Sequence, residues 1–165
     1  MDRIVILEFR PEKGARNKGG HPVGRTLSLH GMNFEWVLYK WIDVKPGDEF
    51  FLLILEEGFS YVLLHGVFKS ELTEKFCKSG RKRYIASLEA DFLECPTKYR
   101  LLEVETLKTA MPDFNWYCPS GNILPDKYVP KIRQMWKEYL EMNDDFIKPQ
   151  SVPFDRISKK HKNYY

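Results

Sequence analysis

The feature that most constrains the fold is a pair of apolar runs joined by a very short connection. Residues 50–55 read Phe-Phe-Leu-Leu-Ile-Leu, and residues 59–68 are apolar except for one serine, one histidine and one glycine. A Glu-Glu-Gly connection at 56–58 separates the runs, and Pro-Gly-Asp at 46–48 precedes the first. Proline and glycine favour turns because proline presets φ and glycine tolerates positive φ. Short apolar runs bounded by turns predict a buried antiparallel hairpin.

Further strands are predicted on both sides of this hairpin. Residues 3–9 are apolar and β-branched, and residues 84–92 alternate between apolar and polar side chains. Residues 34–42 are dense in aromatic side chains and fit either a strand or a short helix. Consecutive strands with tight turns predict a mostly antiparallel sheet, which curls into a barrel and so leaves few open edges.

Two helices complete the predicted fold. Residues 103–111 fit one or two helical turns, and residues 126–141 carry apolar side chains at helical spacing. Ile132, Trp136 and Leu140 lie on one face of the second helix and are expected to be buried against the sheet. The fold class predicted from these elements is α+β.

The length fits one domain spanning residues 1–165. Within it, residues 10–33 read as a long basic loop rich in glycine, and residues 143–165 as a C-terminal loop and basic tail. No apolar run is long enough to cross a membrane. The three cysteines are widely spaced without a Cys-x-x-Cys pair, so neither a zinc site nor a disulfide framework is indicated. We expect a reduced, cytoplasmic protein without a metal or cofactor.

The net charge of +3 is small, but the cations are unevenly distributed. They gather in the glycine-rich loop, around residues 78–83 and near the C-terminus. Basic clusters with nearby aromatic residues can hold nucleic-acid phosphates; the alternative is a set of solvated loops. The residues predicted to contact a nucleic-acid backbone are Arg16, Lys18, Arg25, Lys78, Arg81, Lys82 and Arg83.

An irregular segment rich in aromatic residues at 112–124 is the first candidate ligand site. Trp116 could stack on a flat ring, and Gly121 could let a ligand approach the backbone. The Ser120 hydroxyl could then read the edge of that ring. The alternative is an aromatic loop that fills a gap in the core.

A second aromatic group lies within the segment 34–42. Trp36, Tyr39 and Trp41 could form the opposite wall of a stacking pocket, although large aromatics at strand spacing also serve as core residues. If a pocket exists, Trp116 should face Trp36 or Tyr39 across it. His65 stands inside an apolar strand, where a histidine with satisfied hydrogen bonds is expected rather than a metal ligand.

Catalytic motifs are scarce. The sequence contains no Gly-x-Ser-x-Gly elbow, phosphate loop, dinucleotide fingerprint or His-Glu-x-x-His motif. Lys40, Lys45 and Glu71 could form a lysine–glutamate acid–base pair if the fold brings them together at the mouth of the barrel.

Between Phe34 and Leu140 an ordered set of motifs follows the aromatic segment. These are Val-Lys-Pro-Gly-Asp-x-Phe-Phe-Leu at 44–52, Gly-Val-Phe-Lys-Ser-Glu at 66–71 and Asn-Trp-x-x-x-Ser-Gly-x-x-Leu at 115–124. In this order they resemble the PUA-like β-barrel domains, in particular the EVE- and ASCH-like branch found in prokaryotic restriction and defence proteins. The resemblance implies a mostly antiparallel PUA-like β-barrel with flanking helices. It also implies a pocket lined by Trp36, Tyr39, Trp116, Ser120 and Gly121.

Three functions remain open on these grounds. The first is a module that binds DNA or RNA and recognises a flipped or modified base, with any cleavage supplied by a partner nuclease or effector protein. The second is a small ASCH-like amidohydrolase acting on a modified nucleoside, for which the resemblance offers Lys40, Lys45, Glu71 and Thr73. The third is a domain that binds a peptide or protein through its aromatic loop.

Overall fold

The two central apolar runs form the predicted hairpin. The computed structural model describes residues 3–10, 33–56, 59–93, 101–119 and 121–142. Strands β3 (Glu49–Glu56) and β4 (Phe59–Phe68) pair antiparallel, with one register shift between Leu52 and Leu53.

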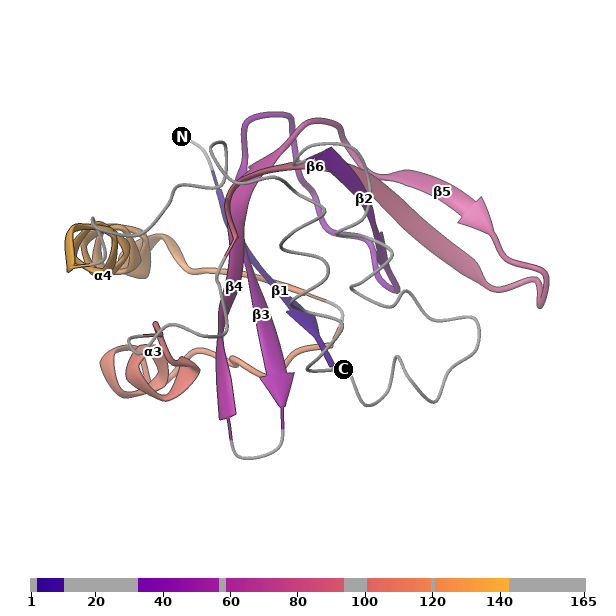
Figure 1. Ribbon diagram of the computed structural model, residues 1–165. Helices are drawn as coiled ribbons and strands as arrows, with labels where there is room; N and C mark the ends of the chain where they lie inside the picture. Colours follow the sequence, from indigo (N-terminus) through magenta and orange to yellow (C-terminus); the bar gives the residue numbers. More distant parts are fainter. Residues whose placement is uncertain (1–2, 11–32, 57–58, 94–100, 120, 143–165) are drawn as a thin grey trace.

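The other strands extend this hairpin into one curled sheet (Figure 1). They are β1 (Ile4–Phe9), β2 (Asn33–Leu38), β5 (Thr73–Phe76), β6 (Lys82–Leu93) and β7 (Asn122–Ile123). The strand order is β2-β6-β4-β3-β1-β7, and β5 pairs with the outer part of β6. All of these pairings are antiparallel except that of β1 with β3, which is parallel. The predicted mostly antiparallel α+β fold is therefore confirmed as a half-barrel sheet with helices.

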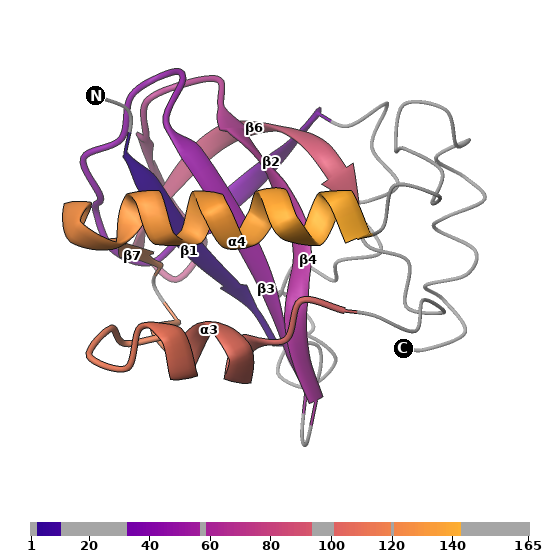
Figure 2. The same cartoon turned by 90° about the vertical axis from the view of Figure 1, so that its left-hand side faces the viewer.

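Two helices cover one face of the sheet (Figure 2). Helix α3 (Val104–Ala110) lies toward the turn end of the hairpin, where Tyr61 pairs with Glu103. Helix α4 (Val129–Met142) crosses the strands after a short 3-10 turn, η1 (Asp126–Tyr128). None of the helices within the described ranges has the length and apolar character that a membrane crossing needs.

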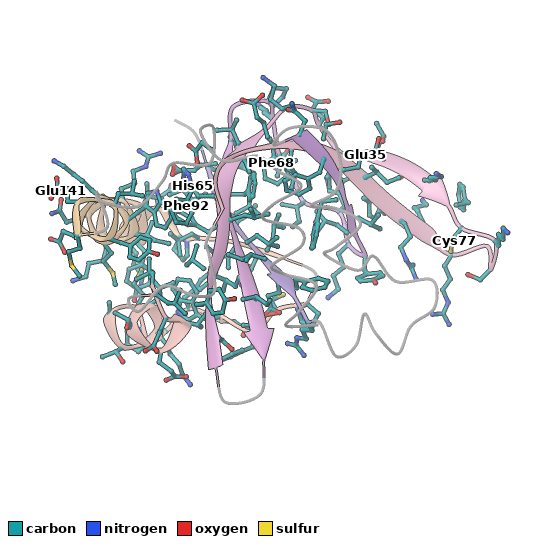
Figure 3. The ribbon with its side chains drawn as sticks, viewed as in Figure 1. Glu35, His65, Phe68, Cys77, Phe92 and Glu141 are labelled. Carbon is teal, nitrogen blue, oxygen red and sulfur yellow. The ribbon has the colours of Figure 1, made fainter. Side chains whose placement is uncertain are left out.

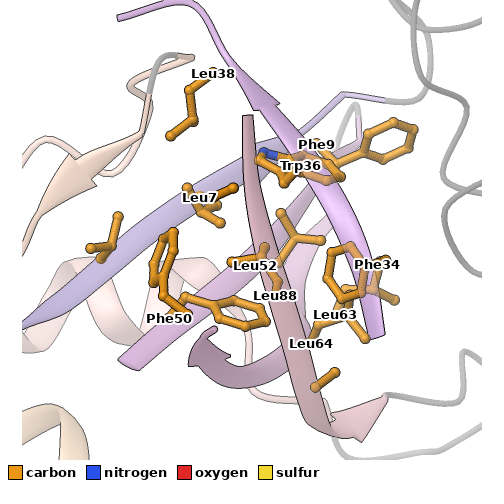
Figure 4. Close-up of a cluster of buried hydrophobic side chains, with 14 of the residues drawn as sticks. Leu7, Phe9, Phe34, Trp36, Leu38, Phe50, Leu52, Leu63, Leu64 and Leu88 are labelled. Carbon is orange, nitrogen blue, oxygen red and sulfur yellow. The ribbon is translucent and has the colours of Figure 1, made fainter. Parts of the chain in front are cut away.

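The sheet buries side chains on both faces because its strands carry apolar residues at successive positions. On β3, Phe50, Leu52 and Ile54 enter the core on the face away from the helices, which Figure 4 shows in close-up. Phe51 and Leu53 point the other way, into the core beneath α3 and α4. Residues adjacent in sequence therefore belong to two separate cores.

The face of α4 differs from the prediction at one position. Ile132 and Trp136 are buried, as expected, but Leu140 is 40% exposed. The buried stripe instead ends on Tyr139. One residue corresponds to about 100° of helix rotation, which moves Leu140 off the sheet. The prediction for Leu140 is therefore wrong.

The curl of the sheet depends on a bulge between β4 and β6. The pairing shifts from His65 opposite Phe92 to Gly66 opposite Ala90, which leaves Asp91 as an additional residue. A Cβ atom on Gly66 would lie only 2.0 Å from the Glu89 carbonyl oxygen, so only glycine fits there. Bulges increase the local twist, which bends the sheet toward a barrel.

Candidate nucleic-acid interface

The two tryptophans predicted to face each other lie in different cores. Trp116 is 1% exposed, belongs to the core beneath the helices, and donates its Nε1 hydrogen to the Met111 carbonyl oxygen at 3.1 Å. Trp36 lies in the other core, with its ring at right angles to that of Phe34. The prediction that Trp116 faces Trp36 or Tyr39 across one cavity is therefore wrong for Trp36, because the sheet lies between the two tryptophans.

The surroundings of Gly121 also differ from the prediction. Its φ of +82° and a hydrogen bond from its N–H to the Cys118 carbonyl oxygen at 3.0 Å form a turn that requires glycine. A Cβ atom there would lie 3.1 Å from the Leu7 side chain and 3.2 Å from that of Ile42. The space above Gly121 is therefore filled by the core rather than open to a ligand. Ser120 lies outside the described residues.

Tyr39 is the predicted ligand residue that reaches the surface. It is 54% exposed, and the guanidinium carbon of Arg83 lies 4.6 Å from the centre of its ring. Leu38, the last residue of β2, pairs with Tyr84 on β6. Tyr39 follows Leu38 and therefore lies beside Arg83, which precedes Tyr84. The structure thus brings a predicted stacking residue next to a predicted phosphate contact.

Three more aromatic side chains lie near Tyr39. Trp41 is 54% exposed and meets the half-buried Tyr84 edge to face, with 5.6 Å between ring centres. Phe76 on β5 is 65% exposed, with the Lys82 ammonium 5.8 Å from its ring centre. Sequence reasoning included Trp41 but missed Phe76 and Tyr84. A phenylalanine in the otherwise polar segment Thr-Glu-Lys-Phe was the available clue, since it has no apolar neighbours to pack with.

The surrounding residues are strongly basic. We call the paired segment Thr73–Ile85 the β5–β6 ribbon; it carries five cations and one carboxylate, a net charge of +4. The whole chain has a net charge of only +3, so the ribbon is one of its basic clusters, beside the glycine-rich loop and the C-terminal tail. Lys78 and Arg81 are exposed in the turn, and Lys82 pairs with Glu74 at 3.4 Å. Four predicted backbone contacts, Lys78, Arg81, Lys82 and Arg83, are therefore in this ribbon, whereas Arg16, Lys18 and Arg25 lie outside the described residues.

The residues offered for an amidohydrolase do not form a connected set. Lys40, Lys45, Glu71 and Thr73 are all exposed. The Thr73 hydroxyl donates to the Ile85 carbonyl oxygen at 3.4 Å, which ties it to the neighbouring strand. In the part of the chain that the structure describes, no hydrogen bond or ion pair joins the side chains of these four residues. Nor do the described residues contain a group of three or more His, Cys, Asp or Glu side chains that could hold a metal ion.

A second polar cluster surrounds the buried His65 where α4 crosses the sheet. The ring nitrogens of His65 lie 2.6 Å from an Asp91 oxygen and 2.7 Å from a Glu49 oxygen. Arg133 on α4 pairs with Glu49 at 3.4 Å, and the Trp136 ring lies 5.1 Å from that of His65. Figure 3 shows His65 on the side of the sheet that α4 covers.

These contacts keep His65 charged. Burial alone lowers its pKa, but the hydrogen bonds to Asp91 and Glu49 outweigh burial and raise the pKa to about 9. The bulge on β6 matters here because Asp91 is the additional residue that it creates. As expected, His65 has satisfied hydrogen bonds. This cluster fastens α4 to the sheet.

The comparisons with known proteins agree on the fold. Neither a family model nor a curated protein sequence matches the chain. A hypothetical protein from Leishmania major has a similar structure, with a TM-score of 0.55 and 11% identity, covering 84% of this chain and 96% of that one. The human THYN1 protein, whose structure is a complex with DNA containing 5-methylcytosine, has a TM-score of 0.54 and 9% identity, covering 81% of this chain and 97% of that one. These likenesses show that this chain shares its fold, a curled half-barrel sheet with helices, with both proteins.

Proposed function

We propose that this protein is a nucleic-acid-binding module whose contact surface consists of the β5–β6 ribbon, Tyr39 and Trp41. The observation that carries the proposal is the mixture of exposed aromatic rings and cations on this surface. Arg83 over Tyr39, at 4.6 Å, and Lys82 beside Phe76, at 5.8 Å, are two examples.

Both components of this surface suit a nucleic acid. Lys and Arg side chains neutralise phosphates and release counterions, which supplies sequence-independent affinity. Exposed rings stack on bases, with about 1–3 kcal/mol gained per stacked base. Trp41 and Phe76 are each more than half exposed, so binding would bury apolar area that the fold leaves in water. The net charge of +4 on the ribbon supports the same conclusion.

The finer proposal is that the module recognises a flipped or modified base, as the EVE- and ASCH-like resemblance implies. The DNA in the THYN1 complex contains a modified base, and the similar fold makes this ligand class the first to test. Of the predicted pocket residues, Tyr39 has the exposed ring that stacking requires, and Trp41 is the exposed neighbour from the same segment. Cleavage of the nucleic acid would come from a partner nuclease or effector protein.

Removing cations from the ribbon should weaken binding and reduce its salt dependence. The variant Lys78→Gln/Arg81→Gln changes two exposed residues of the turn. Each lost phosphate contact should lower the slope of log affinity against log salt concentration by about 0.9 on duplex DNA. Fluorescence anisotropy with labelled oligonucleotides, titrated at several salt concentrations, measures this slope. Duplexes with cytosine or 5-methylcytosine at one position test the finer proposal in the same assay.

The matched control is Lys131→Gln/Lys137→Gln, which removes two exposed cations from α4. Its slope should remain that of the unmodified protein. Equal losses in the two double variants would show that general charge, rather than this surface, drives binding. No measurable affinity for any oligonucleotide at low salt would refute the proposed function.

A further inference from the structure

The part of the β5–β6 ribbon nearest its turn has no visible role in the fold. All four β5 residues are exposed, and among the described strands β5 pairs only with β6. The pairing of β6 with β2 ends at Tyr84, so Lys82 and Arg83, which precede it, pair only with β5. Figure 3 places Cys77 at the far end of this projection, well away from the cores. An isolated two-stranded hairpin is marginally stable in water, so a partner surface would explain why it is built.

The ribbon has different chemistry on its two faces. Paired residues share a face, so Lys75 and Arg83 stand on one side. Phe76 and Lys82 stand on the other. The turn between them adds two more cations and is held by hydrogen bonds from the Cys77 N–H to the Arg81 carbonyl oxygen and from the Gly80 N–H to the Cys77 carbonyl oxygen. Cations therefore surround the ribbon on both faces and at its tip.

This distribution of cations favours binding in the groove of a duplex over binding to a single-stranded nucleic acid. A single strand lying across a ribbon presents its phosphates to one face only, whereas a groove has a phosphate backbone along each wall. Paired strands lie about 4.8 Å apart, and the major groove of B-form DNA, about 12 Å wide, admits a two-stranded ribbon. The minor groove, about 6 Å wide, does not, and the deep, narrow major groove of duplex RNA excludes side chains.

Resting on the proposed function, we propose that the β5–β6 ribbon enters the major groove of duplex DNA and that Phe76 contacts methyl groups on pyrimidine C5. Thymine and 5-methylcytosine both carry this methyl group in the major groove, where an apolar side chain can read it. Phe76 is 65% exposed near the tip, and its neighbour Lys82 is placed to meet a phosphate. Tyr39 and Trp41 stand at the base of the ribbon, where they can meet the same duplex.

The test compares nucleic acids of one sequence on the full chain. Duplex DNA should bind at least about tenfold more tightly than the RNA duplex or either single strand at the same salt concentration. Dimethyl sulfate footprinting should show protection of guanine N7, a major-groove atom, with adenine N3 in the minor groove unprotected. Replacing thymine by uracil should reduce affinity about fourfold for each methyl group that Phe76 contacts.

The variant Phe76→Ala should abolish the thymine–uracil difference while the duplex still binds. Tyr117→Ala, an exposed ring on the loop after α3, is the matched control and should keep the difference. Single strands binding as tightly as duplex DNA, or protection of adenine N3 alone, would overturn the groove proposal while leaving nucleic-acid binding intact. Failure to bind any nucleic acid would instead refute the proposed function and this inference together.

Discussion

The charged state of His65 predicts an unusual dependence of stability on pH. In the folded protein its pKa is raised to about 9 from an ordinary value of 6.5, because the hydrogen bonds to Asp91 and Glu49 outweigh the effect of burial. The folded state therefore binds the proton more tightly than the unfolded chain does. This contribution to the free energy of unfolding is complete below about pH 6.5 and is lost as the pH rises through about 9.

The size of the effect follows from the same two pKa values. The difference between 6.5 and about 9 corresponds to about 3 kcal/mol, lost at up to about 1.4 kcal/mol per pH unit. Because Asp91 is largely exposed, solvent screening reduces its share of this stabilisation. Arg133 also pairs with Glu49, at 3.4 Å, so this carboxylate lies between two cationic side chains.

Urea unfolding followed by tryptophan fluorescence, between about pH 6 and about pH 10, measures this loss. Other groups titrate at the alkaline end, so the decisive quantity is the difference between the unmodified protein and His65→Gln. At about pH 6 the variant should be less stable, and the difference should shrink by about 3 kcal/mol toward pH 10. Asp91→Asn should lower the pH range over which this stabilisation is lost, because one of the two carboxylates that raise the pKa of His65 has lost its charge. A constant difference between the unmodified protein and His65→Gln would refute the assignment of a charged His65.

Two stability predictions test the packing. Gly66→Ala should lower the free energy of unfolding by about 3 kcal/mol or more, because its Cβ would lie 2.0 Å from the Glu89 carbonyl oxygen. Gly80→Ala is the control: nothing lies within 4 Å of its new Cβ atom, so it should lower the free energy of unfolding by only about 1 kcal/mol. Similar losses for the two variants in thermal melts would contradict the close approach at Gly66. Trp116→Ala should cost about 3–5 kcal/mol as a core residue. The exposed Trp41→Ala should stay within about 0.5 kcal/mol, and an unchanged melting temperature for Trp116→Ala would restore its predicted ligand role.

Local sequence patterns were sufficient to predict most elements. The β3–β4 hairpin follows from two apolar runs with a short connection, and α4 follows from apolar residues at helical spacing. Each pattern depends on neighbours within a few residues, and the backbone geometry of strands and helices converts it directly into structure. The basic character of residues 78–83 could be predicted for the same reason.

Tertiary structure alone decided which aromatic residues are available to a ligand. Trp36 and Trp116 both stand in aromatic segments, and the local sequence does not show which face of the sheet each one packs on. Long-range pairing places them in separate cores on opposite faces of the sheet. The parallel pairing of β1 with β3 and the bulge that brings Asp91 to His65 are also long-range events. A strand has the same local pattern whichever partner it pairs with. Tyr39, by contrast, became a surface residue beside Arg83 only because β2 ends where β6 continues into the ribbon.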